Sequence, residues 1–240
     1  MRDHLLDLVQ HTFDLGCIDL VKITGDAERT TIRGLAENKS VVVEGEFAVP
    51  VAEFVGQFGM PNLGKLKILL NLPEYKENAK ITLTRKANNQ PDGVAFENET
   101  GDFKNTYRFM ESAIVNSKLV DLVFTGVKWH VDFEPTVASI MRLKSQAQAN
   151  AEEPTFQART VNGDLKFNFG DHSTHAGEFI FQPGVNGVLK RAWSWPVVQI
   201  MSILNLVGDK RMHISDDGCA KITVNSGLAV YDYILPAQSK

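Results

Sequence analysis

The hexapeptide PVAEFV at residues 50–55 resembles the hexapeptide PVVQIM at residues 196–201, and this pairing decides how the fold is interpreted. A second pair follows in the same order, AKITLT at residues 79–84 and AKITVN at residues 220–225. A longer loop within residues 71–78 would absorb the small difference in spacing. Two ordered matches predict two divergent copies of one strand-helix-strand unit. The alternative is that proline-initiated helices and amphipathic strands resemble each other by chance.

Around these matches, hydrophobic periodicity predicts a few helices among many short strands, which is the pattern of an α+β protein. The helices are predicted at residues 2–14, from Pro50 to Gly59, at residues 135–148, and from Pro196 to Leu204. The strands are predicted at residues 18–22, 30–35, 41–47, 66–72, 81–85, 94–98, 105–110, 129–133, 156–161, 165–169, 178–182, 211–214, 221–224 and 229–235. Asn162-Gly163 is a strong signal for a hairpin turn.

An apolar segment without a clean period separates the two halves of the chain. We interpret residues 113–128 as an extended connector with one packed side. The sequence therefore predicts a first domain at residues 1–112 and a second domain at residues 129–240.

Composition places the chain among intracellular globular proteins. Hydrophobic residues make up 43% and charged residues 22%, and the formal net charge is −4. No apolar run reaches membrane-spanning length, and the first residues lack the pattern of a signal peptide. Cys17 and Cys219 form no paired motif, so we expect reduced thiols. The predicted location is the cytoplasm, that of the host cell if the protein is viral.

One cluster has the residue types of a metal site. Asp171, His172 and His175 lie close in sequence, and Asp216 lies in a later turn. A metal-dependent hydrolase would need these ligands to converge on one point, and we interpret the cluster as a solvated turn. The sequence contains no nucleophile elbow, phosphate loop or dinucleotide fingerprint. We therefore expect no catalytic residues, no metal and no cofactor.

Basic residues gather mainly on the helix predicted at residues 135–148. Arg142 and Lys144 lie there without a nearby acid, and Lys190 and Arg191 precede the helix that begins at Pro196. A solvated helix face is one interpretation. The other is a weakly basic surface that contacts phosphates without distinguishing between bases.

The chain resembles the sliding clamps of DNA polymerases, of the phage and proliferating-cell-nuclear-antigen type. The resemblance covers the order of elements and the tail at residues 228–237, which is similar in type to clamp endings. It implies two copies of a clamp domain, with antiparallel sheets outside and helices lining a ring. It also implies a homotrimer around duplex DNA, a processivity role without catalysis, and short peptides of polymerase and clamp loader as partners.

The resemblance assigns candidate sites. DNA would contact Arg2, Arg142, Lys144, Lys190 and Arg191, with the second domain dominant because Asp3, Asp7 and Asp14 accompany Arg2. Subunits would join edge to edge through Tyr107, Phe109, Phe179 and Phe181, unless these strands pair within one chain. Partner peptides would bind at Leu119, Val120, Ile234, Leu235 and Pro236, which core packing explains equally well. The main rival function is a β-rich viral structural subunit that assembles by its edges.

Overall fold

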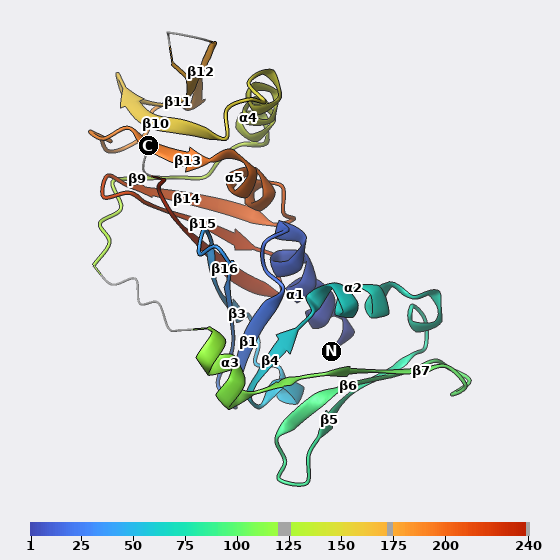
Figure 1. Ribbon diagram of the computed structural model, residues 1–240. Helices are drawn as coiled ribbons and strands as arrows, with labels where there is room; N and C mark the ends of the chain where they lie inside the picture. The colour runs from blue at the N-terminus through green and yellow to red at the C-terminus, as the bar shows by residue number, and fades with distance from the viewer. Residues whose placement is uncertain (120–125, 172–174, 239–240) are drawn as a thin grey trace. The chain divides into compact units, whose positions relative to one another are not determined.

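A computed structural model describes residues 1–119, 126–171 and 175–238, which form two compact units (Figure 1). Unit 1 comprises the described residues up to 119 together with Asn225–Tyr231. Unit 2 comprises the remaining described residues, from 126 to 224 and from 232 to 238.

Unit 1 contains helices and two antiparallel sheets. Its helices are α1 (Arg2–Thr12), α2 (Leu63–Asn71) and α3 (Ser112–Lys118), with short 3-10 turns η1 (Phe13–Leu15), η2 (Ala52–Phe54) and η3 (Pro73–Tyr75). Its strands are β1 (Leu20–Gly25), β2 (Thr30–Leu35), β3 (Val42–Phe47), β4 (Gly56–Pro61), β5 (Lys80–Arg85), β6 (Pro91–Glu97), β7 (Lys104–Arg108) and β8 (Met110–Glu111). They are ordered β8-β4-β1-β2-β3 and β5-β6-β7.

Unit 2 is built from the same kinds of element. Its helices are α4 (Val137–Ala149) and α5 (Val197–Leu204). Its strands are β9 (Val131–Phe133), β10 (Thr155–Val161), β11 (Asp164–Gly170), β12 (Ala176–Gln182), β13 (Trp193–Pro196), β14 (Asp209–Ser215), β15 (Cys219–Asn225) and β16 (Ala229–Pro236). They are ordered β12-β11-β10-β13 and β16-β15-β14-β9, and the first three residues of β16 belong to unit 1.

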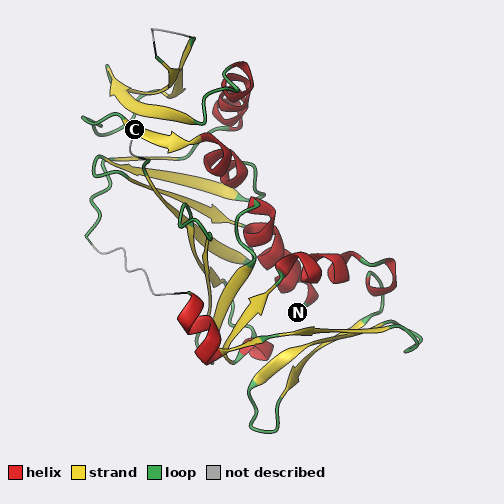
Figure 2. Ribbon diagram, viewed as in Figure 1, coloured by secondary structure: helices red, strands yellow, loops and turns green. Residues whose placement is uncertain are grey.

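The order of elements repeats along the chain. The series α1-β1-β2-β3-β4-α2-β5-β6-β7 has the same sequence of helices and strands as α4-β10-β11-β12-β13-α5-β14-β15-β16. The sheets repeat as well, since β4-β1-β2-β3 matches β13-β10-β11-β12 and β5-β6-β7 matches β14-β15-β16. In each copy the two longer helices pack against each other (Figure 2). The α+β class and the twofold repetition are therefore confirmed.

Both sequence matches that suggested the repeat are wrong in register. The counterpart of α5 is α2, so residues 196–201 correspond to the region after Pro61 and not to residues 50–55. Residues 80–84 of the first match lie in β5, whereas residues 220–225 lie in β15, the counterpart of β6. The order of helices and strands is nevertheless the same in both copies. Burial restricts the pattern of elements more tightly than it restricts the identity of each residue.

Two predicted elements of the first copy are wrong in type. The helix predicted from Pro50 to Gly59 is a 3-10 turn followed by β4, and Gly56 has a φ of +119°, which helices do not accommodate. The strand predicted at residues 66–72 lies within α2. Leu63, Leu66 and Leu70 recur at helical spacing and are buried together, which favours a helix.

The predicted connector is only partly extended. Residues 112–118 form α3, which buries Val115, and residues 120–125 lie outside the described residues. The proposed domain boundaries at 112 and 129 stay a prediction.

Each unit has its own apolar core. In unit 1, Leu5 and Leu8 of α1 are buried along with Val21, Phe58 and Met60 of the sheet. The core of unit 2 includes five aromatic side chains that are nearly inaccessible: Phe156, Phe167, Phe169, Phe181 and Trp195. These cores fix which faces of the helices remain exposed.

Candidate functional site

Helix α4 presents a polar, positively charged face. Thr136 caps its start by accepting a hydrogen bond from the backbone N–H of Ser139 at 3.0 Å. Leu143 is buried, while Arg142 and Lys144 are exposed, and the helix contains no acidic residue. The guanidinium of Arg142 lies 5.5 Å from the ring centre of Phe179, a cation–π contact that holds it over β12. Lys144 is the side chain of this helix that is free to reach a ligand.

Helix α5 carries no charge at all, and Val198 on it is 67% exposed. Lys190 and Arg191 lie in the loop between β12 and β13 with exposed side chains. Their backbone N–H groups donate to one carboxylate oxygen of Asp216, at 2.8 and 2.7 Å. Asp216 therefore holds this basic loop in place.

Helix α1 contributes less charge to the surface than its sequence suggests. The guanidinium of Arg2 donates to the backbone oxygen of Leu70 at 3.0 Å, which ties α1 to α2. Asp7, predicted on the polar face, is buried, and its carboxylate accepts a hydrogen bond from the Tyr231 hydroxyl at 2.7 Å. Burial raises the pKa of Asp7, but hydrogen bonds from His11 and Tyr231 outweigh burial and leave it below its usual range.

Helix α2 supplies two basic residues that the sequence interpretation missed. Lys65 is exposed, and Lys67 forms an ion pair with Asp14 at 2.7 Å. They were missed because this segment was assigned as a strand. The leucine spacing of α2 would have revealed both of them.

The four aromatic residues predicted at a subunit joint pack inside their own units. Tyr107 is buried and donates its hydroxyl to the backbone oxygen of Pro61, and Phe109 stacks on Phe58 with ring centres 4.3 Å apart. Burial raises the pKa of the Tyr107 hydroxyl. Phe181 stacks on Phe167 at 4.3 Å, and Phe179 meets that ring edge-on. These side chains support the strands from within, and their place at a subunit joint stays a prediction.

Tyr107 lies on β7, Phe109 follows that strand, and Phe179 and Phe181 lie on β12; both strands lie at sheet edges. β7 ends the order β5-β6-β7, and β12 ends the order β12-β11-β10-β13. On β12, the Glu178 carboxylate accepts from Arg159 at 2.7 Å, Lys166 at 2.7 Å and Asn168 at 2.6 Å. Hydrogen bonds from Lys166, Asn168 and Arg159 lower the pKa of Glu178 to about 2.

The residues predicted to bind partner peptides are mostly buried. Leu119 is buried in unit 1, and Ile234 and Leu235 are buried in unit 2. Pro236 is exposed, and Val120 lies outside the described residues. A peptide could therefore reach only part of this set without rearrangement.

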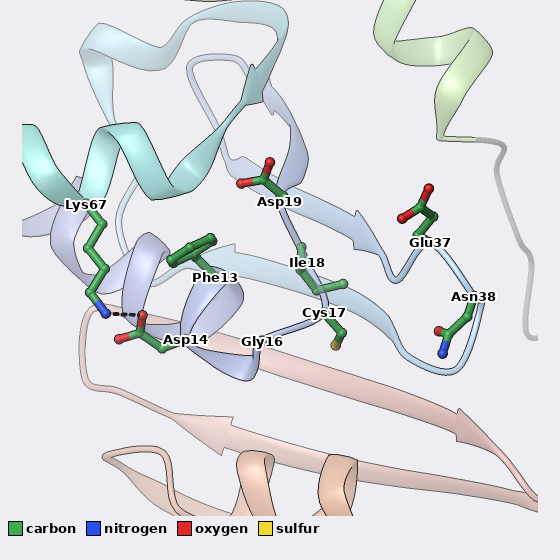
Figure 3. Close-up of a pocket in the computed structure, with 9 residues that line it drawn as sticks. All are labelled: Phe13, Asp14, Gly16, Cys17, Ile18, Asp19, Glu37, Asn38 and Lys67. Carbon is green, nitrogen blue, oxygen red and sulfur yellow. Dashed lines mark hydrogen bonds and ion pairs between the residues drawn. The ribbon is translucent and has the colours of Figure 1, made fainter.

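A cleft of about 820 Å³ opens on unit 1 (Figure 3). It is lined by Phe13, Asp14, Gly16, Cys17, Ile18, Asp19, Glu37, Asn38 and Lys67. Burial raises the pKa of the Cys17 thiol, so this cysteine is a poor nucleophile. The carboxylates outnumber the single lysine, which already pairs with Asp14. The cleft has the wrong charge for a phosphate.

The metal-site interpretation gains no support. Within residues 1–119, 126–171 and 175–238, no group of three or more His, Cys, Asp or Glu side chains could hold an ion. His172 lies outside the described residues, and Asp216 is engaged by backbone N–H groups. In the same described ranges, no helix is both long and apolar enough to cross a membrane.

Comparison with known proteins identifies the fold. No protein-family model and no curated protein matches the chain. Among solved structures, PCNA from Thermococcus kodakaraensis has a TM-score of 0.69 and 11% identity, covering 99% of this chain and 97% of that one. PCNA of A. fulgidus, bound to the C-terminal region of FEN-1, has a TM-score of 0.73 and 9% identity, covering 100% and 97%.

Proliferating cellular nuclear antigen from Entamoeba histolytica has a TM-score of 0.67 and 11% identity, covering 97% of this chain and 94% of that one. At such low identity these matches establish the fold. The chain has the two-copy fold of PCNA sliding clamps over its whole length, which confirms the predicted resemblance at that level.

Proposed function

We propose that this chain is a DNA sliding clamp, a non-catalytic processivity factor that encircles duplex DNA and tethers DNA polymerase to it. The observation that carries the proposal is the duplicated topology, which matches PCNA folds over 97% or more of this chain. The proposal needs no cofactor, because the ring itself keeps the polymerase on its template. The proposed location is the cytoplasm.

Strand edges support a homotrimer. Within unit 1, β3 lies beside residues 229–231 of β16, and the backbone N–H of Ala48 donates to Leu228 at 2.8 Å. Gly45 packs so closely there that a Cβ would lie 2.9 Å from the Tyr231 ring. By the repeat, β12 is the counterpart of β3 and β7 is the counterpart of β16, and both are edge strands. The same pairing between chains would join β12 of one to β7 of the next.

The exposed helix faces support loose contact with DNA. Lys65 on α2 and Lys144 on α4 are exposed, and α5 contributes no charge. Few phosphate contacts favour sliding, since each tight contact must be broken as the ring moves. Arg142, Lys190 and Arg191 would add weaker contacts, and Arg2 would act mainly through its bond to Leu70.

Partner binding is proposed by analogy of fold. A PCNA has been solved with the C-terminal region of FEN-1 bound. We propose that polymerase and clamp loader likewise attach by short peptides, and that Pro236 is the residue of the predicted set that such a peptide could contact without rearrangement.

The decisive experiment compares circular with linear duplex DNA. A ring should stay on closed circular DNA after loading and leave when the circle is cut once, because its hold is topological. Mass photometry should report three chains per particle, and electron microscopy should show a central hole. A stable monomer would overturn the proposal. A large open polymer would instead favour the β-rich structural subunit.

A further inference from the structure

The two copies of the fold differ at one sheet edge. In unit 2, β9 covers the outer edge of β14, with Phe133 opposite Met212 and Val131 opposite Ile214. In unit 1, the counterpart of β14 is β5, and no described strand pairs with its outer side (Figure 1). An edge of this kind presents unpaired backbone N–H and C=O groups to any extended chain.

The uncovered edge leaves apolar side chains accessible. Met212 and Ile214 of β14 are each 1% exposed. The equivalent pair on β5, Ile81 and Leu83, is only partly buried. The first copy therefore keeps apolar surface at the position where the second copy is covered by a strand.

A cleft of about 500 Å³ runs along this edge. It is lined by Met1, Ala52, Glu53, Ile81, Thr82, Leu83 and Arg85. Successive side chains of a strand point to opposite faces, so lining by three consecutive residues of β5 is expected of a cleft at the strand edge. The cleft thus lies where an added strand would sit.

One wall of the cleft is already fixed. The guanidinium of Arg85 donates to the backbone oxygen of Glu53 at 2.9 Å, of Val55 at 3.1 Å and of Asn89 at 2.9 Å. These bonds hold η2 beside the end of β5. A preformed wall lowers the entropy cost of binding an extended ligand.

The chemistry of β9 indicates which ligand fits. Val131 and Phe133 lie opposite the buried side chains of β14, while Asp132 between them accepts two hydrogen bonds from Arg211, at 2.7 and 2.5 Å. When Ile81 and Leu83 are aligned with Met212 and Ile214, Lys80 takes the place of Arg211. The matching ligand is an acidic residue between two apolar ones.

We propose that the free edge of β5 binds an extended peptide of a partner protein, which adds as an antiparallel strand with an apolar-acidic-apolar pattern. This is binding by strand addition, with backbone bonds giving affinity and Lys80 selecting the acidic residue. The inference is separate from the proposed ring, because the site lies within unit 1 of a single chain.

The test uses the chain's own β9 sequence as the probe. A fluorescent peptide VKWHVDFEP, taken from residues 127–135, is titrated with the full chain and followed by anisotropy. We expect saturable binding, and we expect the amides of β5 to become protected from hydrogen exchange.

Charge reversal tests the register. Lys80→Glu should weaken binding about two- to fivefold, as loss of an exposed ion pair predicts, and a peptide with Lys in place of Asp132 should bind this variant better. Lys118→Glu is the matched control, because it reverses one exposed charge on α3, which is not part of this sheet, and it should leave affinity unchanged.

Backbone methylation tests the binding mode. The N–H of His130 donates to Ile214 at 2.9 Å, so the N–H groups of His130 and Asp132 face the sheet and those of Val131 and Phe133 face away. Methylating the backbone nitrogens of His130 and Asp132 in the peptide should abolish binding. Methylating those of Val131 and Phe133 should not. Absence of saturable binding, or equal binding of both methylated peptides, would overturn the proposal. So would β5 protection that appears without peptide and rises with protein concentration, because a second copy would then occupy the edge.

Discussion

The side chain of Asp7 shows how a single residue changes role between sequence and structure. Its position on α1 suggested a solvated acid, but it is 8% exposed and bonded to Tyr231, which lies 224 residues later in the chain. Interactions over such sequence distances leave no local pattern. The sequence shows that residue 7 is polar, but it does not show that the Asp7 side chain is buried.

Asp7→Asn should destabilise the chain. The isosteric amide keeps the shape of the side chain but loses its charge-assisted hydrogen bonds, so we expect a loss of about 1–3 kcal/mol in the free energy of unfolding. Urea denaturation at neutral pH measures it. Asp3→Asn, an exposed change on the same helix, should stay within about 0.5 kcal/mol. Equal losses in both variants would contradict this account.

The stabilising effect of Asp7 should depend on pH. Because folding lowers its pKa, its charged form stabilises the folded state above its unfolded pKa of about 4, and this contribution is lost as pH falls through the folded pKa. The difference between the original chain and Asp7→Asn should therefore shrink in acid. A constant difference from neutral pH to about pH 3 would show that the charge of Asp7 is not responsible.

Glu178 also has a lowered pKa, but unlike Asp7 it is exposed. Its pKa falls to about 2, yet its side chain is 37% exposed, so solvent screens its three hydrogen-bonded partners. We expect Glu178→Gln to cost about 0–1 kcal/mol at neutral pH, less than Asp7→Asn. This contribution too should vanish as pH falls from about 4 towards 2. Urea titration of both variants ranks them, and a larger loss for Glu178→Gln would be the contradicting result.

At the scale of elements, the second copy was predicted better than the first. Helix α4, helix α5 and the hairpin across Asn162-Gly163 all lie where hydrophobic periodicity, proline and turn signals placed them. In the first copy, α2 was missed because its leucines also suit a buried strand. The helix predicted from Pro50 failed because its buried residues Phe54 and Phe58 lie in a 3-10 turn and in β4, and not on one face of a helix.

Because α2 was predicted as a strand, the exposed Lys65 was not recognised as a candidate DNA contact, and this role can be tested. Lys65→Ala and Lys144→Ala should each reduce salt-sensitive retention on circular DNA. The slope of log affinity against log salt should fall by about 0.9 for each phosphate that the variant no longer neutralises. Arg142 is left intact because its guanidinium packs over Phe179.

The control for this pair is Lys39→Asn. It removes one positive charge from the turn between β2 and β3, and asparagine tolerates the φ of +58° found there. It should leave the salt slope unchanged. If Lys65→Ala and Lys144→Ala behave like this control, the exposed faces of α2 and α4 do not contact DNA.

For the whole molecule, the sequence predicted the duplication and joining of subunits edge to edge, but not how the aromatic residues assigned to that joint would pack. The aromatic residues expected between subunits pack inside each unit, because a strand's buried face and its free edge are different surfaces. Among the described strands, β7 and β12 both end a sheet, and they are the counterparts of the neighbouring strands β16 and β3. The proposed trimer would therefore depend on strand pairing, which charge can block.

Ile180→Lys tests that dependence directly. Ile180 is a partly buried residue of β12, paired with Lys166 of β11, and Lys104 and Arg108 lie on β7. A further positive charge on β12 should repel the β7 strand of a neighbouring subunit and convert trimers into folded monomers, measured by mass photometry and circular dichroism. Val188→Lys adds the same charge at a loop residue that is 58% exposed and should leave the trimer intact. If the trimer survives Ile180→Lys, the subunits join somewhere other than this edge, because an edge strand that tolerates added like charge cannot be the one that pairs.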